Sequence, residues 1–296
     1  MSLHSEANPV AIITGSSQGI EKSLVKDFLD SGYKVFINSS DEHALKDMVT
    51  DISSTEGDTD NISYFVGDIS ENGFADKLIE EVIKKWGRLD VLINNGKITN
   101  NPKITSDEEC IPENKIQQLQ QPSSYSIPEE YQTSDPLIRG IYYCIKAAVT
   151  RKLSDNDDGN LSIINISSCQ GCLTQETVNS FTEFNFGVDP YVDSMARIES
   201  LTKSIALELA DRGIRVNGIV PGLVFDDMNQ EIINDIDRRK YEGSKVPLRR
   251  IGMPHEISKV ALFLASDGAS YITGSMIPVD GGLTLKRPNY YAEVLY

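Results

Sequence analysis

The chain has 296 residues, of which 40% are hydrophobic and 24% are charged, values usual for a globular protein with a well-buried core. Its 28 basic and 44 acidic residues give a formal net charge of −16, which argues against nucleic acid or an anionic membrane surface as the main partner. No stretch approaches the length of a membrane span, and the N-terminus lacks the basic and apolar regions of a signal peptide. We therefore expect one cytoplasmic domain over residues 1–296.

Short apolar runs alternate with amphipathic stretches along the first hundred residues. The runs are continuously apolar rather than alternating, which is typical of strands in a parallel sheet covered by helices on both faces. We predict helices at about 19–31, 42–52 and 74–86, and strands in the segments VAIITG, YKVFIN, ISYFVGD and LDVLINN.

Residues 99–135 interrupt this pattern, because they are polar and rich in Pro, Ser, Gln and Glu. We interpret them as a long surface insertion. The pattern then resumes with helices at about 138–153, 191–210 and 255–265, and strands in LSIINISS, IRVNGIVPG and SMIPVDGG. The sequence therefore predicts an α/β fold of the doubly wound Rossmann type, with a parallel seven-stranded sheet and helices on both faces.

Cysteine content gives no sign of a metal site. Cys169 and Cys172 form a CxxC pair, but no second pair or histidine cluster lies near them in the sequence to complete a zinc site. Four cysteines are also too few for a disulfide scaffold in a chain of this length. We expect ordinary thiols and no bound metal.

Short motifs occur in a fixed order over residues 9–286. They are TGSSQGIE at 14–21, GD at 67–68, INN at 93–95, NISS at 165–168, a tyrosine at 191 opening a helix, IRVNGIVPG at 214–222 and YITGSMIPVDGG at 271–282. This set resembles the short-chain dehydrogenase/reductase family. Within that family, GLVFDDM, SKVPL, VDGGLTLKR and the long insertion are most similar to the pteridine reductases.

The resemblance implies NAD(P)H as cofactor, a small-molecule carbonyl or pteridine substrate, and a homo-oligomer formed through the fourth and fifth helices. Glycines in the first strand-to-helix turn let a dinucleotide pyrophosphate approach the backbone and the helix N-terminus. The cofactor-binding positions that it implies are Gly15, Ser17, Gln18, Gly19, Ile20, Ser40, Asp41, Asp68, Ile69, Asn95, Gly96, Pro221 and Gly222.

Several of these positions depart from the family pattern. The third glycine of the turn is Glu21, whose carboxylate suits the helix dipole but stands where a pyrophosphate would bind. No Arg or Lys follows the second strand, so Asp41 favours NAD over NADP. The usual Ala-Gly after the fourth strand is Gly96-Lys97. We expect cofactor binding to be weak or lost.

The family's catalytic groups are an Asn, a Ser, a Tyr and a Lys, and only two of them match. Ser168 occupies the serine position and Tyr191 the tyrosine position, whereas Leu137 stands at the Asn position. The lysine, one helical turn after the tyrosine, is Met195. A thioether carries no positive charge, and a phenol without a nearby cation keeps a pKa of about 10.

Two hypotheses therefore stay open. The first is a catalytically impaired or inactive protein that acts by binding a ligand or a subunit, such as an active paralogue. The second is an active NAD(P)H-dependent oxidoreductase that reduces a carbonyl or pteridine substrate with Ser168 and Tyr191, helped by Lys97. The sequence favours the first.

Overall fold

The computed structural model describes residues 8–15, 19–56, 60–96, 133, 135–154, 160–169, 190–225, 232 and 234–285. Everything below concerns these residues. Most of the predicted insertion at 99–135 lies outside them, as do four of the residues singled out from the sequence: Ser17, Gln18, Lys97 and Cys172.

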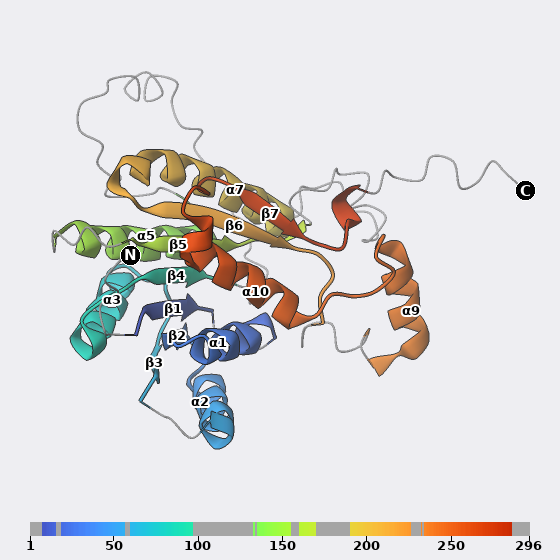
Figure 1. Ribbon diagram of the computed structural model, residues 1–296, viewed down its shortest axis with the longest axis horizontal. Helices are drawn as coiled ribbons and strands as arrows, with labels where there is room; N and C mark the ends of the chain where they lie inside the picture. Colours follow the sequence, from blue (N-terminus) through green and yellow to red (C-terminus); the bar gives the residue numbers. More distant parts are fainter. Residues whose placement is uncertain are drawn as a thin grey trace, which may run out of the picture.

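A single parallel sheet of seven strands forms the centre of the molecule (Figure 1), as the sequence predicts. Its spatial order is β3-β2-β1-β4-β5-β6-β7, and each neighbouring pair is parallel. The direction of winding reverses between β1 and β4, and ligands of such sheets bind outside the carboxyl ends of the strands at this point. The strands are β1 Val10–Thr14, β2 Lys34–Ser39, β3 Ile62–Val66, β4 Val91–Asn94, β5 Ser162–Ile166, β6 Arg215–Pro221 and β7 Met276–Val279.

Helices cover both faces of the sheet (Figure 1). One apolar layer packs α3, α5 and α7 against the sheet, and the other packs α1, α2 and α10 against the opposite face. Alternation along β1 serves both layers, since Val10 and Ile12 face the first and Ala11 and Ile13 the second. The helices are α1 Ile20–Asp30, α2 Glu42–Glu56, α3 Phe74–Trp86, α5 Pro136–Ser154, α7 Pro190–Leu209 and α10 Pro254–Ala265.

One further helix, α9 (Ile236–Lys245), was not predicted from the sequence. Most of its side chains are exposed, so it has no apolar stripe with helical spacing. Its start is set instead by Asp235, whose side chain accepts hydrogen bonds from the backbone N–H groups of Asp237 and Arg238 at 2.9 and 3.0 Å. Figure 1 shows α9 beyond the two packed layers, next to the end of β7.

A buried chain of polar side chains joins β4, β5 and α7. The Asn94 amide donates to Asn165 Oδ1 at 2.8 Å, and the Asn165 amide donates to Thr202 Oγ1 at 2.9 Å. Thr202 in turn donates to the carbonyl of Ile198 at 2.7 Å. All three polar side chains are fully buried, so each depends on these bonds for its hydrogen-bonding partners. The chain fixes α7 against the sheet close to the carboxyl edge.

We expect Thr202→Val to lower the free energy of unfolding by about 1–3 kcal/mol, because it leaves the buried Asn165 amide without its acceptor. Urea denaturation followed by circular dichroism measures this. Thr50→Val is the matched control, since exposed Thr50 makes the same type of bond to the carbonyl of Lys46, at 2.8 Å. Equal effects of the two substitutions would contradict a structural role for the buried chain.

Candidate functional site

The turn between β1 and α1 lies against the end of β4. Gly15 has a φ of 70°, and a Cβ atom added there would lie 1.9 Å from the carbonyl oxygen of Asn95. Both the conformation and the space therefore require glycine. Gly19 is the N-cap of α1 and, being a glycine, has no side chain that could cap the helix. In dinucleotide sites, phosphate binds to backbone amides at a helix N-terminus.

Glu21, at the position of the family's third glycine, points into the protein. It is fully buried, and the Asn95 side-chain amide donates to its Oε1 at 2.5 Å. The carboxylate is thus directed toward the end of β4 and away from solvent.

The residues expected to hold the adenosine part lie on two neighbouring loops. Gly67 N–H donates to the carbonyl of Ser39 at 2.9 Å, which joins the ends of β2 and β3. Asp41 is exposed and accepts a bond from Ala44 N–H at 3.0 Å. Asp68 is also exposed and accepts from Ser70 N–H at 2.8 Å. The two carboxylates therefore have solvent-facing positions as well as these turn-forming bonds.

Leu137 and Met195, which the sequence resemblance assigned to the Asn and Lys positions, are both buried apolar side chains. Leu137 lies in the first turn of α5, where it is 8% exposed, and a Cβ added at Gly96 would lie 2.0 Å from its Cδ1. Met195 is 3% exposed and belongs to the same apolar cluster as Leu137. Both side chains are thus part of the apolar packing between α5, α7 and the sheet.

Ser168 and Tyr191 stand at the same carboxyl edge. Ser168 is half-buried and follows β5 by two residues, and Tyr191 is a half-buried residue of the first turn of α7 that packs against the core. Between these elements, the Ser167 hydroxyl donates to the carbonyl of Met195 at 3.1 Å. The end of β5 is therefore held directly to the turn of α7 that carries the tyrosine.

Asp135 is a site residue that the sequence analysis missed. Its Oδ1 accepts from Leu137 N–H at 2.9 Å, and its Oδ2 accepts from the Ser194 hydroxyl at 2.5 Å. Asp135 thus caps the start of α5 and joins this helix to α7 at Ser194, the residue before Met195. The sequence signal was the Asp-Pro pair, since Asp is a preferred N-cap and Pro a preferred first helical residue.

Two findings on the described residues concern cations and metal binding. Lys203, further along α7, is bound to Glu199 at 2.5 Å. Within the ranges that the structure covers, no group of three or more His, Cys, Asp and Glu side chains could hold a metal ion. Cys144 and Cys169 are buried thiols, and burial raises the pKa of Cys144 to about 12. In the same part of the chain, no helix has the length and apolar character needed to cross a membrane.

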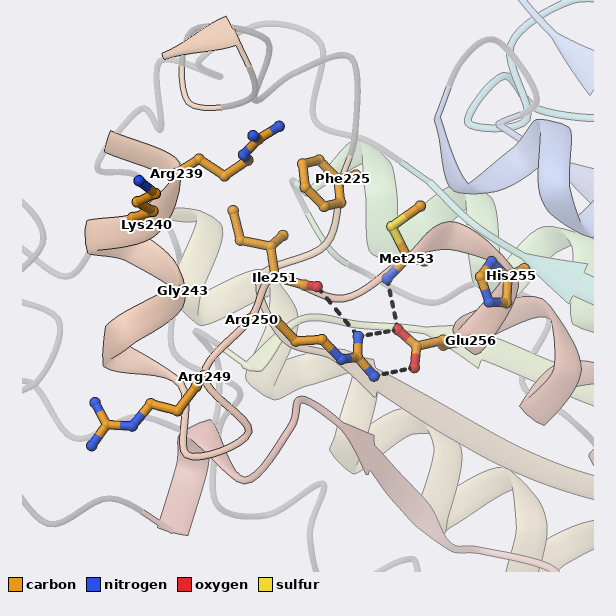
Figure 2. A pocket seen from close by; sticks show the side chains of 10 residues that line it. All are labelled: Phe225, Arg239, Lys240, Gly243, Arg249, Arg250, Ile251, Met253, His255 and Glu256. Atoms are coloured by element: carbon orange, nitrogen blue, oxygen red, sulfur yellow. Dashed lines mark hydrogen bonds and ion pairs between the residues drawn. The ribbon is translucent and has the colours of Figure 1, made fainter. Parts of the chain in front are cut away.

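A pocket of about 460 Å³ lies between α9 and the start of α10. Figure 2 shows Arg239 extending from α9 toward Phe225, which follows Pro221 and Gly222 by a few residues. Arg250 and Glu256 form a bidentate ion pair of 2.7 and 2.6 Å at this pocket. The Arg250 guanidinium, with the Met253 N–H, holds the pKa of Glu256 down to about 2. The full lining is Phe225, Arg239, Lys240, Gly243, Arg249, Arg250, Ile251, Met253, His255 and Glu256.

Comparison with known sequences places this arrangement among reductases. A family model described as enoyl-(acyl carrier protein) reductase matches residues 15–284. The 3-oxoacyl-[acyl-carrier-protein] reductase FabG of Staphylococcus aureus is 31% identical over 274 residues, 92% of this chain and 97% of that protein. The enzyme of the same name from Chlamydia trachomatis is 31% identical over 276 residues, 93% of this chain and 97% of its own.

Solved structures of NADP complexes are also similar to this chain. A structure titled "ElxO with NADP Bound" matches with a TM-score of 0.70 and 26% identity, covering 94% of this chain and all of that one. The Pseudomonas aeruginosa RhlG/NADP active-site complex matches with a TM-score of 0.70 and 26% identity, covering 95% of this chain and 98% of that one.

The Arg250–Glu256 pair predicts a pH effect. Because the Glu256 pKa is about 2 in the folded protein against 4.5 for a free carboxyl, the unfolded chain binds more protons between these values. This contribution to stability is present above pH 4.5 and is lost as the pH falls toward 2. We expect Glu256→Gln to reduce the fall in Tm between pH 5 and about 3, measured by scanning calorimetry relative to wild type. Arg250→Gln should flatten the same slope, and an unchanged slope in both variants would contradict the assignment.

Proposed function

The chain belongs to the short-chain dehydrogenase/reductase family, and we propose that it is a slow NAD(P)H-dependent reductase of a carbonyl group. The observation that carries the proposal is the close packing of Gly15 against the Asn95 carbonyl, which places the start of α1 at the point where the winding of the sheet reverses. Ser168 and Tyr191 stand at the same edge of the sheet. This supports an active enzyme over a protein that has lost its cofactor site.

The cofactor would lie across the switch point between β1 and β4. Gly15, Gly19 and Ile20 would hold the pyrophosphate through backbone groups. Further along, Ser40 and Asp41 would contact the ribose, Asp68 and Ile69 the adenine, and Asn95, Gly96, Pro221 and Gly222 the nicotinamide half. When bound, NAD(P)H supplies a hydride to the carbonyl carbon. We propose NADH over NADPH, because Asp41 offers an acceptor to a ribose hydroxyl and would repel a 2′-phosphate.

Proton transfer is the step that we expect to be slow. Tyr191 would donate its proton to the carbonyl oxygen, which Ser168 would hold by a hydrogen bond. Because Met195 is uncharged and buried, it cannot favour the ionised phenol as a lysine would. General acid catalysis contributes about 10²–10⁴-fold, so a poorly tuned acid costs part of that range.

A second candidate is a binding protein without turnover, which pairs with an active paralogue or holds a ligand. The burial of Leu137 and Met195 in one apolar cluster favours it, because this packing leaves no polar group at two of the catalytic positions. Turnover that depends on Tyr191 decides between the two candidates.

The pocket beside α10 bears on the identity of the substrate. Phe225, Ile251 and Met253 give the pocket beside α10 an apolar wall that suits a ketone with an apolar body or a flat pteridine. The motifs shared with pteridine reductases support the pteridine. Oxidation of NADH and NADPH with a pterin and with a panel of ketones separates these substrates.

Titration of the purified protein with NADH and NADPH, followed by calorimetry, tests the proposal first. We expect micromolar binding with a preference for NADH, because the glycines that approach a pyrophosphate are present at positions 15 and 19. No binding at millimolar concentrations of either cofactor would contradict a reductase function.

We expect Met195→Lys to raise turnover by roughly tenfold or more, because a cation one turn from Tyr191 favours the ionised phenol. Met195→Leu is the control for packing and should leave turnover unchanged. Tyr191→Phe should abolish the remaining activity. Circular dichroism and Tm establish that each variant is folded, and a folded, cofactor-binding Met195→Lys protein without a gain would show that the lysine is not the limiting group.

Self-association through α5 and α7 also stays a proposal, as does a cytoplasmic location. Leu153 at the end of α5 is 41% exposed and Leu207 near the end of α7 is 84% exposed, which suits a contact between copies. We expect Leu207→Glu to shift the protein toward the monomer in light scattering coupled to size exclusion. The control is Leu285→Glu, which changes an equally exposed residue outside these helices.

A further inference from the structure

The pocket between α9 and α10 carries positive charge in a chain that is strongly acidic overall. Residues 236–256, which run from α9 into the first turn of α10, contain six basic and three acidic side chains, against 28 basic and 44 acidic ones in the whole chain. Among the described residues that line the pocket, four have a guanidinium or ammonium group and one, Glu256, has a carboxylate. A concave surface with charge of one sign attracts ligands of the opposite sign.

Glu256 does not offset the other positive charges, because its carboxylate is already engaged. Arg250 donates to both of its oxygens, at 2.7 and 2.6 Å, and the Met253 N–H donates to Oε2 at 2.8 Å. Arg250 and Glu256 therefore neutralise each other as a pair. The positive charge that remains at the pocket comes from the three other cations of the described lining.

Arg239 is the cation best placed to meet a bound molecule. Figure 2 shows its side chain extending from α9 toward Phe225, whereas the side chain of Arg249 extends away from Phe225. Arg249 is also engaged, since its Nη1 donates to the carbonyl of Ser244 at 2.9 Å. Within the part of the chain that the structure describes, no hydrogen bond or ion pair holds the Arg239 side chain. Its guanidinium N–H groups are therefore available to a ligand.

The apolar side of the pocket adjoins the carboxyl edge of the sheet. Phe225 lies just after β6, and its N–H donates to the carbonyl of Gly252 at 2.9 Å, which fixes it beside the segment leading to α10. Ile251 and Met253 extend this apolar wall. A volume of about 460 Å³ suits a small organic molecule. The pocket thus offers an apolar wall together with a cation that no protein group neutralises.

We propose that Arg239 recognises an anionic group, a carboxylate or a phosphate, on a substrate whose apolar body lies against Phe225. This inference rests on the proposed function in taking the ligand to be the carbonyl substrate. Arg239 then determines which carbonyl compounds bind, because a guanidinium pairs with two oxygens of a carboxylate or phosphate at once. A neutral ketone with the same body lacks this contact.

Binding of 3-phenylpropanoate, phenyl phosphate and the neutral 3-phenylpropan-1-ol is measured by calorimetry, with ligand-detected NMR for weak binders. We expect wild type to bind at least one anion more tightly than the alcohol. Arg239→Gln should weaken binding of that anion about tenfold and leave the alcohol unaffected. The anion with the larger loss identifies the group as carboxylate or phosphate. Arg239→Lys keeps the charge but not the paired geometry, so its affinity should lie between the two.

Arg212→Gln is the matched control, because it removes an exposed arginine from the turn between α7 and β6, outside the pocket, with the same change in net charge. It should alter none of these affinities. Equal binding of the anions and the alcohol by wild type would overturn the inference. So would an Arg239→Gln protein with unchanged affinity for the anions, or with equal losses for anions and alcohol.

Turnover separates this inference from the proposed function. In the reduction of 4-phenyl-2-oxobutanoate and its neutral ethyl ester with NADH, we expect Arg239→Gln to raise KM for the acid about tenfold at unchanged kcat, and to leave the ester unaffected. Reduction of the ester without any binding of the anions would overturn the inference and support the proposed function. Binding of an anion through Arg239 without reduction of either compound would contradict the proposed function and leave charge recognition established.

Discussion

The turn between β1 and α1 passes so close to the end of β4 that the Asn95 carbonyl leaves no room for a side chain at Gly15. This contact brings three segments together at the place where the winding of the sheet reverses. The position of Glu21 depends on this contact, since its side chain can reach Asn95 only because the two backbones are this close.

The segment after β4 also packs against α5, because Leu137 lies next to Gly96. Leu137 and Met195 belong to one apolar cluster, and the bonds that hold α5 and α7 together are made by Asp135 and Ser194 instead. This contact holds the two helices together beside the edge of the sheet where Ser168 and Tyr191 stand.

Binding and proton transfer thus depend on different parts of the structure. The elements expected to hold a dinucleotide are backbone turns and helix ends, which are also needed for packing and survive many substitutions. Proton transfer depends on individual side chains, so a single substitution can weaken it. The two requirements can therefore vary independently in a chain that matches a reductase over 92% of its length.

The sequence by itself indicated the strands, because short, mostly apolar runs between amphipathic stretches are typical of a parallel sheet covered by helices on both faces. Helical spacing likewise determined that Met195 follows Tyr191 by one turn. Only the tertiary structure decided where the Glu21 carboxylate points and how Asp135 joins two helices. Their partners lie 74 and 59 residues away in the chain, and no local pattern carries that information. The helix α9 escaped prediction for a related reason: its exposed side chains leave no apolar periodicity, and its position depends on neighbours distant in sequence.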